Sequence, residues 1–194
     1  MKAVLASGNA GKVREFAALL GACDIEVIPQ TAFGIETPEE TGTTFLENAL
    51  LKARHAAANA GLPALADDSG LEVDALGGRP GVWSARYAGE QASDADNLQL
   101  LLRELADVPD ERRTARYRCV LVFIREPADP QAVVASGVWE GRVLHAPRGA
   151  NGFGYDPIFQ PQGLALSAAE LSATEKNGVS HRAQALRALL AALR

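Results

Sequence analysis

The first twenty residues, MKAVLASGNAGKVREFAALL, join a short apolar segment to a turn with two glycines and then to an amphipathic segment. Residues 2–6 are typical of a β-strand. Val13, Phe16 and Leu20 recur at helical spacing. Residues 12–20 are therefore predicted to form a helix with one buried face. A strand that leads at once into a helix is typical of α/β folds.

The same mixture of strand and helix patterns continues along the 194 residues. The segment TARYRCVLVFIR at 114–125 alternates and is rich in β-branched and aromatic residues, so it predicts the longest strand. The other predicted strands are 25–28, 64–66, 133–138 and 142–145. Capping boxes are predicted at Thr44/Glu47 and Ser167/Glu170. Predicted helices cover 44–60, start at Ser93 with Asp96, and start at Ser180. We predict an α/β fold in a single domain, 1–194, with a mixed β-sheet flanked by helices.

Composition excludes several classes of partner. The net charge is −5, which argues against the broad basic face of a protein that binds nucleic acid or anionic membranes. No segment approaches the ~20 apolar residues of a membrane span, and no signal peptide is apparent, so we expect a cytoplasmic protein. Cys23 and Cys119 share no metal-binding spacing and are expected to be reduced thiols.

The turn Ser7–Lys12, SGNAGK, is suited to binding an anion. Its glycines let backbone N–H groups approach a ligand, and the following helix adds the partial positive charge of its N-terminus. Lys12 adds a charge that suits phosphate, and Ser7 and Asn9 can donate hydrogen bonds. On this stretch alone, a tight turn that needs glycine only for its geometry explains the sequence equally well. The spacing is not that of a P-loop, because Val13 replaces the hydroxyl residue that binds magnesium.

Asp67 and Asp68 directly follow the apolar segment 64–66. We expect the strand to end there, and ligands of open α/β sheets gather outside the carboxyl ends of strands. Two adjacent carboxylates are costly unless a cation or hydrogen-bond donors compensate them. Mg²⁺ takes one or two carboxylates together with phosphate oxygens, and Glu39 or Glu40 could supply the second one. A solvated turn is the alternative.

A third segment, Gly149–Pro157, places glycines around aromatic residues. Such a backbone can fold closely over a flat ligand, with a ring available for stacking; the alternative is a glycine-rich hairpin whose rings fill the core. Further along stand Lys176 and the pair His181-Arg182, which falls in the first turn of the last predicted helix. Basic residues there oppose the helix dipole, so helix stability does not explain them.

These segments follow one another as SGNAGK, EETGTTFLENALLKA, DDSGLEVDALGGRPGVWSARYAG, GFGYDPIF and KNGVSHR. In this order they resemble the inosine triphosphate pyrophosphatase family, whose members hydrolyse dITP, ITP and XTP. The resemblance extends from residue 2 to the C-terminal helix. It implies an elongated mixed sheet, two lobes with an active-site cleft between them, a homodimer, and Mg²⁺ as the cofactor.

The resemblance also implies roles for individual residues. Asp68 would be the general base and a Mg²⁺ ligand, Glu39 would be the second metal ligand, and Ser69 would contact the substrate. The residues that would hold the triphosphate are Ser7, Gly8, Asn9, Ala10, Gly11 and Lys12. Those that would form the nucleobase pocket are Phe153, Gly154, Tyr155, Asp156, Lys176, His181 and Arg182.

The expected reaction is attack of water on the α-phosphorus of a non-canonical purine nucleoside triphosphate, which releases the monophosphate and pyrophosphate. Two alternatives stay open: a pyrophosphatase for other modified nucleotides, as in the Maf-like family, and a nucleotide sensor without turnover. Selectivity is expected to depend chiefly on Arg182. The 6-oxo group of hypoxanthine or xanthine accepts hydrogen bonds from a guanidinium group, whereas the 6-amino group of adenine can only donate them.

Overall fold

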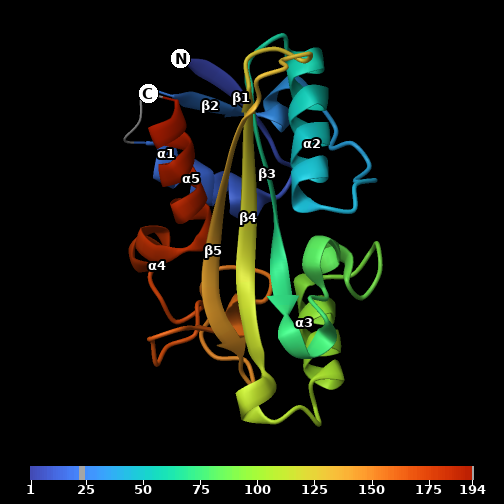
Figure 1. Ribbon diagram of the computed structural model, residues 1–194, viewed down its shortest axis with the longest axis vertical. Helices are drawn as coiled ribbons and strands as arrows, with labels where there is room; N and C mark the ends of the chain where they lie inside the picture. The colour runs from blue at the N-terminus through green and yellow to red at the C-terminus, as the bar shows by residue number, and fades with distance from the viewer. Residues whose placement is uncertain (22–24, 194) are drawn as a thin grey trace. The chain divides into compact units, whose positions relative to one another are not determined.

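The computed structural model describes residues 1–21 and 25–193 and contains a six-stranded sheet in the order β2-β1-β3-β4-β5-β6 (Figure 1). The strands are β1 (Lys2–Ala6), β2 (Glu26–Pro29), β3 (Ala64–Val73), β4 (Thr114–Ile124), β5 (Val133–Val143) and β6 (Phe159–Pro161). The α-helices are α1 (Ala10–Leu20), α2 (Phe45–Ala60), α3 (Asp94–Glu104), α4 (Ala173–Val179) and α5 (His181–Ala192). Strand β1 is parallel to β2 and β3, whereas β5 and β6 are antiparallel, so the predicted mixed α/β sheet is confirmed.

The chain forms two compact units. The first unit comprises Met1–Asp68, Cys119–Gly137 and Arg182–Arg194, and the second comprises Ser69–Arg118 and Val138–His181. The boundaries fall inside β3, β4 and β5 and at the start of α5. A single domain, and a cleft between two lobes, stay predictions.

In the first unit, helices cover both faces of the strands. One face of β1 and β3 packs against α2, which contributes a row of buried alanines that includes Ala49, Ala53 and Ala56. The other face packs against α1 and α5, through residues such as Phe16 and Leu186. Figure 1 shows α2 on one side of these strands and α1 with α5 on the other. Small side chains on α2 let the helix backbone come close to the sheet, so a longer side chain on that face can reach a strand.

The second unit has a core of its own. Leu98 and Leu101 of α3, together with its C-cap Leu105, pack with Leu71 of β3 and with neighbouring strand residues. The buried guanidinium group of Arg113 donates hydrogen bonds to the backbone carbonyls of Leu105, Val143 and Leu144 at 2.6–2.9 Å. Because these carbonyls end α3 and β5, the arginine fixes the ends of both elements.

Several element boundaries differ from the predictions. The most important is in β3, which does not end at Ala66, as predicted, but continues through the acidic pair to Val73. The two strands predicted at 133–138 and 142–145 are one continuous strand, β5. Helix α1 begins at Ala10 because Asn9 caps it, two residues before the predicted start at Lys12.

The capping box predicted at Ser167 and Glu170 does not start a helix. The Ser167 N–H donates to Glu170 within a turn, and the Ser167 hydroxyl donates to the Arg148 carbonyl. The capping box that starts α4 lies one turn later, at Ser172 and Glu175, and α4 was not predicted. Ser167 and Ser172 are followed three residues later by glutamate in the same way, so the local pattern did not distinguish them.

No helix in the described part of the chain is long and apolar enough to span a membrane. Cys119 is a free, buried thiol whose pKa is raised by burial. Cys23, the other predicted thiol, lies outside the described residues.

Candidate active site

The turn between β1 and α1 presents backbone donors at a helix N-terminus. Asn9 is the N-cap, and its side chain accepts a hydrogen bond from the Lys12 N–H at 3.0 Å. The Ser7 hydroxyl oxygen accepts from the Asn9 N–H at 3.3 Å. The N–H groups of Ala10 and Gly11, in the first turn, have no intrahelical acceptor by helix geometry. The turn therefore has the form of an anion-binding site.

Asp67 lies next to this turn, because β1 and β3 pair in register up to Ala6 and Ala66. Its fully buried carboxylate is 2.9 Å from Lys12 Nζ and 3.7 Å from Arg182 Nε. Burial by itself raises the pKa of Asp67, but the charges of Lys12 and Arg182 outweigh burial and hold this pKa well below its ordinary value. Asp67 is therefore an ionised anchor for the two cations.

Arg182 extends this network to α1. One guanidinium nitrogen of Arg182 donates to the Glu15 carboxylate at 2.7 Å, and the arginine side chain is buried. These contacts link the start of α5 to the first turns of α1, which directly follow the anion-binding turn. Glu15 was not among the predicted site residues.

Asp68 is held by two residues of α2. Lys52 Nζ donates to Asp68 Oδ1 at 2.8 Å, and Asn48 Nδ2 donates to Asp68 Oδ2 at 3.4 Å. Burial raises the pKa of Asp68 above its ordinary value, although the charge of Lys52 opposes the rise. Asp68 thus has the properties of a proton acceptor with a fixed orientation.

Lys52 also bridges Asp68 to Glu40, whose Oε1 lies 2.7 Å from the same Nζ. The lysine side chain is only 5 % exposed. Burial lowers the pKa of Lys52, but the charges of Asp68, Asp67 and Glu40 together raise it above its ordinary value. Lys52 is therefore an ammonium group shared by two carboxylates.

Asn48 has its orientation fixed by the backbone. Its Oδ1 accepts a hydrogen bond from the Gly42 N–H at 2.8 Å, so its Nδ2 must face Asp68. The same contact ties the segment that carries Glu40 to α2.

The two adjacent aspartates lie on opposite faces of β3, as alternation along a strand requires. Asp67 shares the face of Leu65, which is covered by α1 and α5. Asp68 shares the face of Ala66, which is covered by α2. Each carboxylate therefore has its own lysine, and their different surroundings move their pKa values in opposite directions.

The carboxylates fit a magnesium ion in number and type. Asp68 and Glu40 both contact Lys52 Nζ, so the two carboxylates lie close to each other around the ammonium group, and Mg²⁺ commonly takes one or two carboxylates plus substrate phosphates. Glu39, the predicted second ligand, has an exposed side chain. Within the described residues, no group of three or more His, Cys, Asp and Glu side chains forms a metal cluster.

The predicted nucleobase residues of the second unit include a buried ion pair. Lys176 Nζ lies 2.5 Å from Asp156 Oδ2, and the same oxygen accepts the Phe153 N–H at 2.9 Å. The Lys176 ammonium group stands 5.1 Å from the centre of the Phe153 ring. Asp156 thus fixes the lysine and the backbone of the aromatic residue together.

The neighbours of this pair have structural contacts. Tyr155 is buried, and its hydroxyl donates to the Ser84 carbonyl at 2.8 Å. The Gly154 N–H donates to Asp94 Oδ2 at 2.8 Å. His181 is buried in the same unit and stacks on Tyr117, with ring centres 4.7 Å apart, whereas Arg182 belongs to the first unit. Ser69 is half-buried on β3.

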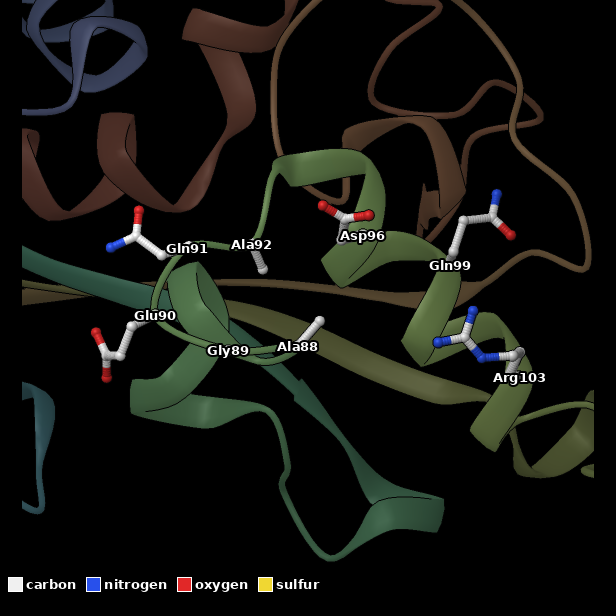
Figure 2. A pocket seen from close by; sticks show the side chains of 8 residues that line it. All are labelled: Ala88, Gly89, Glu90, Gln91, Ala92, Asp96, Gln99 and Arg103. Atoms are coloured by element: carbon white, nitrogen blue, oxygen red, sulfur yellow. The ribbon is translucent and has the colours of Figure 1, made fainter.

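The second unit has a depression with a volume of about 630 Å³, whose lining side chains are drawn in Figure 2. Glu90 and Gln91 line it from a loop, and Asp96, Gln99 and Arg103 line it from α3. Asp96 is already the partner of Ser93 in the capping box of α3. None of the predicted site residues lines this depression, so it is separate from the candidate site.

Comparisons with known proteins identify the family of the chain. A family model described as the Ham1 family matches residues 3–192. The chain belongs to the Ham1 family. A protein from Yersinia pestis named dITP/XTP pyrophosphatase is 59 % identical over 193 residues, which cover 100 % of this chain and 98 % of that protein. A protein of the same name from Escherichia coli O157:H7 is 57 % identical with the same coverage.

Solved Ham1 structures have the same fold. A HAM1 protein from Coxiella burnetii is 50 % identical and matches with a TM-score of 0.90 over 100 % of this chain and 98 % of that chain. A Mycobacterium abscessus protein described as nucleoside-triphosphatase / dITP/XTP pyrophosphatase is 46 % identical, with a TM-score of 0.77 and coverage of 98 % and 99 %. The family resemblance predicted from the sequence is thus confirmed.

Three residues of the candidate site were not predicted from the sequence: Asn48, Lys52 and Glu15. A signal for the first two exists in the sequence. Both fall on the buried face of α2, which otherwise consists of alanines and Phe45, and they are spaced at i, i+4. A lysine on such a face requires a buried partner.

Proposed function

We propose that this chain is a Mg²⁺-dependent nucleoside triphosphate pyrophosphohydrolase that converts non-canonical purine nucleotides such as dITP, ITP and XTP to the monophosphate and pyrophosphate. The names of its relatives support the reaction and the substrate class. The observation that carries the proposal is Asp68, a buried carboxylate with a raised pKa beside an anion-binding turn.

In this mechanism Asp68 takes the proton of the attacking water. Lys52 and Asn48 each hold one of its oxygens from the side of α2, which orients the lone pairs that remain. A raised pKa makes the carboxylate a better proton acceptor. Lys12 and the first N–H groups of α1 bind the phosphates. Mg²⁺, when bound, would neutralise phosphate charge and orient the water.

We assign the second metal-binding carboxylate to Glu40 in place of Glu39. The shared contact with Lys52 supports Glu40, whereas the Glu39 side chain is exposed. Since Lys52 occupies the space between Asp68 and Glu40, it neutralises the pair before a metal ion binds.

The purine base would be recognised by the predicted nucleobase residues of the second unit. The Phe153 ring offers a stacking surface, and the Lys176 ammonium group, held by Asp156, is a donor for the 6-oxo group of the purine. His181, Arg182 and Ser69 are assigned to substrate contact on the family resemblance. Homodimer formation and a cytoplasmic location are also proposed on the family resemblance.

The test is a panel of dITP, ITP, XTP, ATP and GTP with Mg²⁺, scored for pyrophosphate and orthophosphate. Pyrophosphate from the inosine and xanthine nucleotides is expected. Orthophosphate alone would mean cleavage at the γ-phosphate and would contradict the mechanism. Tight binding without products would support a sensor, and turnover confined to other modified nucleotides would support a Maf-like activity.

Lys12→Ala is expected to raise KM for every triphosphate by roughly 10- to 150-fold, the effect of losing a hydrogen bond to a charged group. The ratio of kcat/KM between dITP and dATP should stay constant, because a phosphate contact does not depend on the base. Arg14→Ala removes an exposed charge two residues away and is the matched control. A loss confined to one base would mean that Lys12 does not bind the phosphates.

Arg182→Ala is expected to reduce the kcat/KM ratio of dITP to dATP by roughly 5- to 150-fold, because the guanidinium group would no longer donate to the 6-oxo group. His181→Ala should act in the same direction but less. Arg187→Ala, at an exposed position of the same helix, is the control. Equal losses for both nucleotides would instead assign Arg182 to the ion network with Glu15 and Asp67.

A further inference from the structure

A hydroxyl group that belongs to none of the predicted site residues lies beside the β1–α1 turn. Thr37 follows the 3₁₀ helix Gln30–Phe33, and its side chain is exposed. A Cβ atom added at Gly8 would lie only 2.8 Å from Thr37 Oγ1, closer than real Cβ atoms approach a neighbour. Glycine at position 8 therefore allows the hydroxyl to stand directly against the backbone of the turn.

The position of Thr37 is fixed from inside the protein. Gln30 is 1 % exposed, and its Nε2 donates to Thr37 Oγ1 at 2.8 Å. Gln30 directly follows the end of β2, whose Pro29 pairs with Leu5 of β1. The sheet thus fixes the position of the Gln30 backbone, and the Gln30 side-chain amide fixes the position of the Thr37 hydroxyl. A threonine hydroxyl that accepts a hydrogen bond still has its own proton to donate.

We propose that Thr37 is a further phosphate-binding residue, which donates a hydrogen bond to the condensed phosphate chain of the substrate, and that Gln30 is its positioning residue. The proposal rests on the proposed function, since it takes the β1–α1 turn as the phosphate site. The exposed hydroxyl of Thr37 lies against the turn at Gly8. The N-terminus of α1, with Lys12 in its first turn, begins two residues later at Ala10. Phosphate oxygens only accept hydrogen bonds, so a hydroxyl whose acceptor side is occupied is matched to them.

The test measures binding of inorganic tripolyphosphate with Mg²⁺ by titration calorimetry, because this probe has neither base nor sugar. Thr37→Val, which keeps the shape and loses the hydroxyl, is expected to weaken binding by roughly 10- to 100-fold. Thr37→Ser should stay within about threefold of the original chain, since it keeps the donor. Thr31→Val, at another exposed threonine of the same segment, is the control. Equal affinity of the Thr37→Val variant and the original chain would overturn the inference.

The role of Gln30 is tested by a double-mutant cycle with Gln30→Met. If Gln30 acts through Thr37, this change weakens tripolyphosphate binding in the original chain and has little further effect in Thr37→Val. Additive losses would overturn the positioning role. The proposed function fails separately: a chain that hydrolyses dITP to pyrophosphate while Thr37→Val leaves KM and tripolyphosphate affinity unchanged overturns only the inference about Thr37. A chain that hydrolyses no nucleotide overturns both.

Discussion

Asp68→Asn is expected to lower kcat for dITP by at least about 10²–10⁴-fold, the usual effect of losing a general base, with a further loss from weaker metal binding. Asparagine has nearly the shape of aspartate, and Lys52 keeps its contact with Glu40, so the fold should persist. The measurement is steady-state release of pyrophosphate, with a thermal unfolding curve to confirm the fold.

Asp67→Asn is the matched control, since it changes the neighbouring carboxylate on the opposite face of β3. Asp67 holds Lys12 and Arg182, so its loss is expected to act mainly on KM. The opposite result, with kcat abolished in Asp67→Asn and preserved in Asp68→Asn, would exchange the roles of the two residues.

Lys52→Met is expected to lower the free energy of unfolding by about 3–5 kcal/mol in the absence of metal, because breaking a buried ion pair leaves its carboxylates uncompensated. Asp68 and Glu40 would then lie close together without their shared ammonium group. A divalent cation can replace that charge, so Mg²⁺ should raise the melting temperature of Lys52→Met more than that of the original chain. The measurement is thermal unfolding with EDTA and over a Mg²⁺ titration.

Lys2→Met is the control for this experiment. Lys2 pairs with Glu26 at 3.7 Å, but its side chain is 63 % exposed, and surface pairs contribute at most about 1 kcal/mol. If Mg²⁺ stabilised the Lys52 variant no more than the original chain, Asp68 and Glu40 would not be the metal ligands. The kcat of the Lys52→Met variant is expected to fall as well, since Lys52 orients the Asp68 carboxylate.

Local signals in the sequence predicted most elements of the fold. The capping boxes at Thr44 and Ser93 start helices at the expected residues, because both hydrogen bonds of a capping box form within four residues. The end of β3 could not be predicted in the same way. Asp67 and Asp68 disfavour a strand locally, and they are accommodated because Lys12 and Lys52, far away in the sequence, neutralise them.

The candidate site could be predicted only in part, because some of its features are local in the sequence and others depend on long-range contacts. Glycine turns and acidic pairs can be recognised within a few residues, so the sequence alone could propose the β1–α1 turn and Asp68 as candidates. The partners of Asp68 depend on which face of α2 meets β3, and this is decided by tertiary packing. The choice between Glu39 and Glu40 likewise depends on one long-range contact, that of Glu40 with Lys52.

The alignment of β1 with β3 has a consequence for the reaction itself. The two strands pair as Val4 with Ala64, Leu5 with Leu65 and Ala6 with Ala66. A slip of one residue in β3 would turn every side chain to the other face, so Asp67 would meet Lys52 and Asp68 would meet Lys12. Insertion or deletion of a single residue before the acidic pair would therefore inactivate the enzyme even if the sheet re-formed. Under the proposed roles of Asp67 and Asp68, the register between β1 and β3 therefore determines catalysis as well as folding.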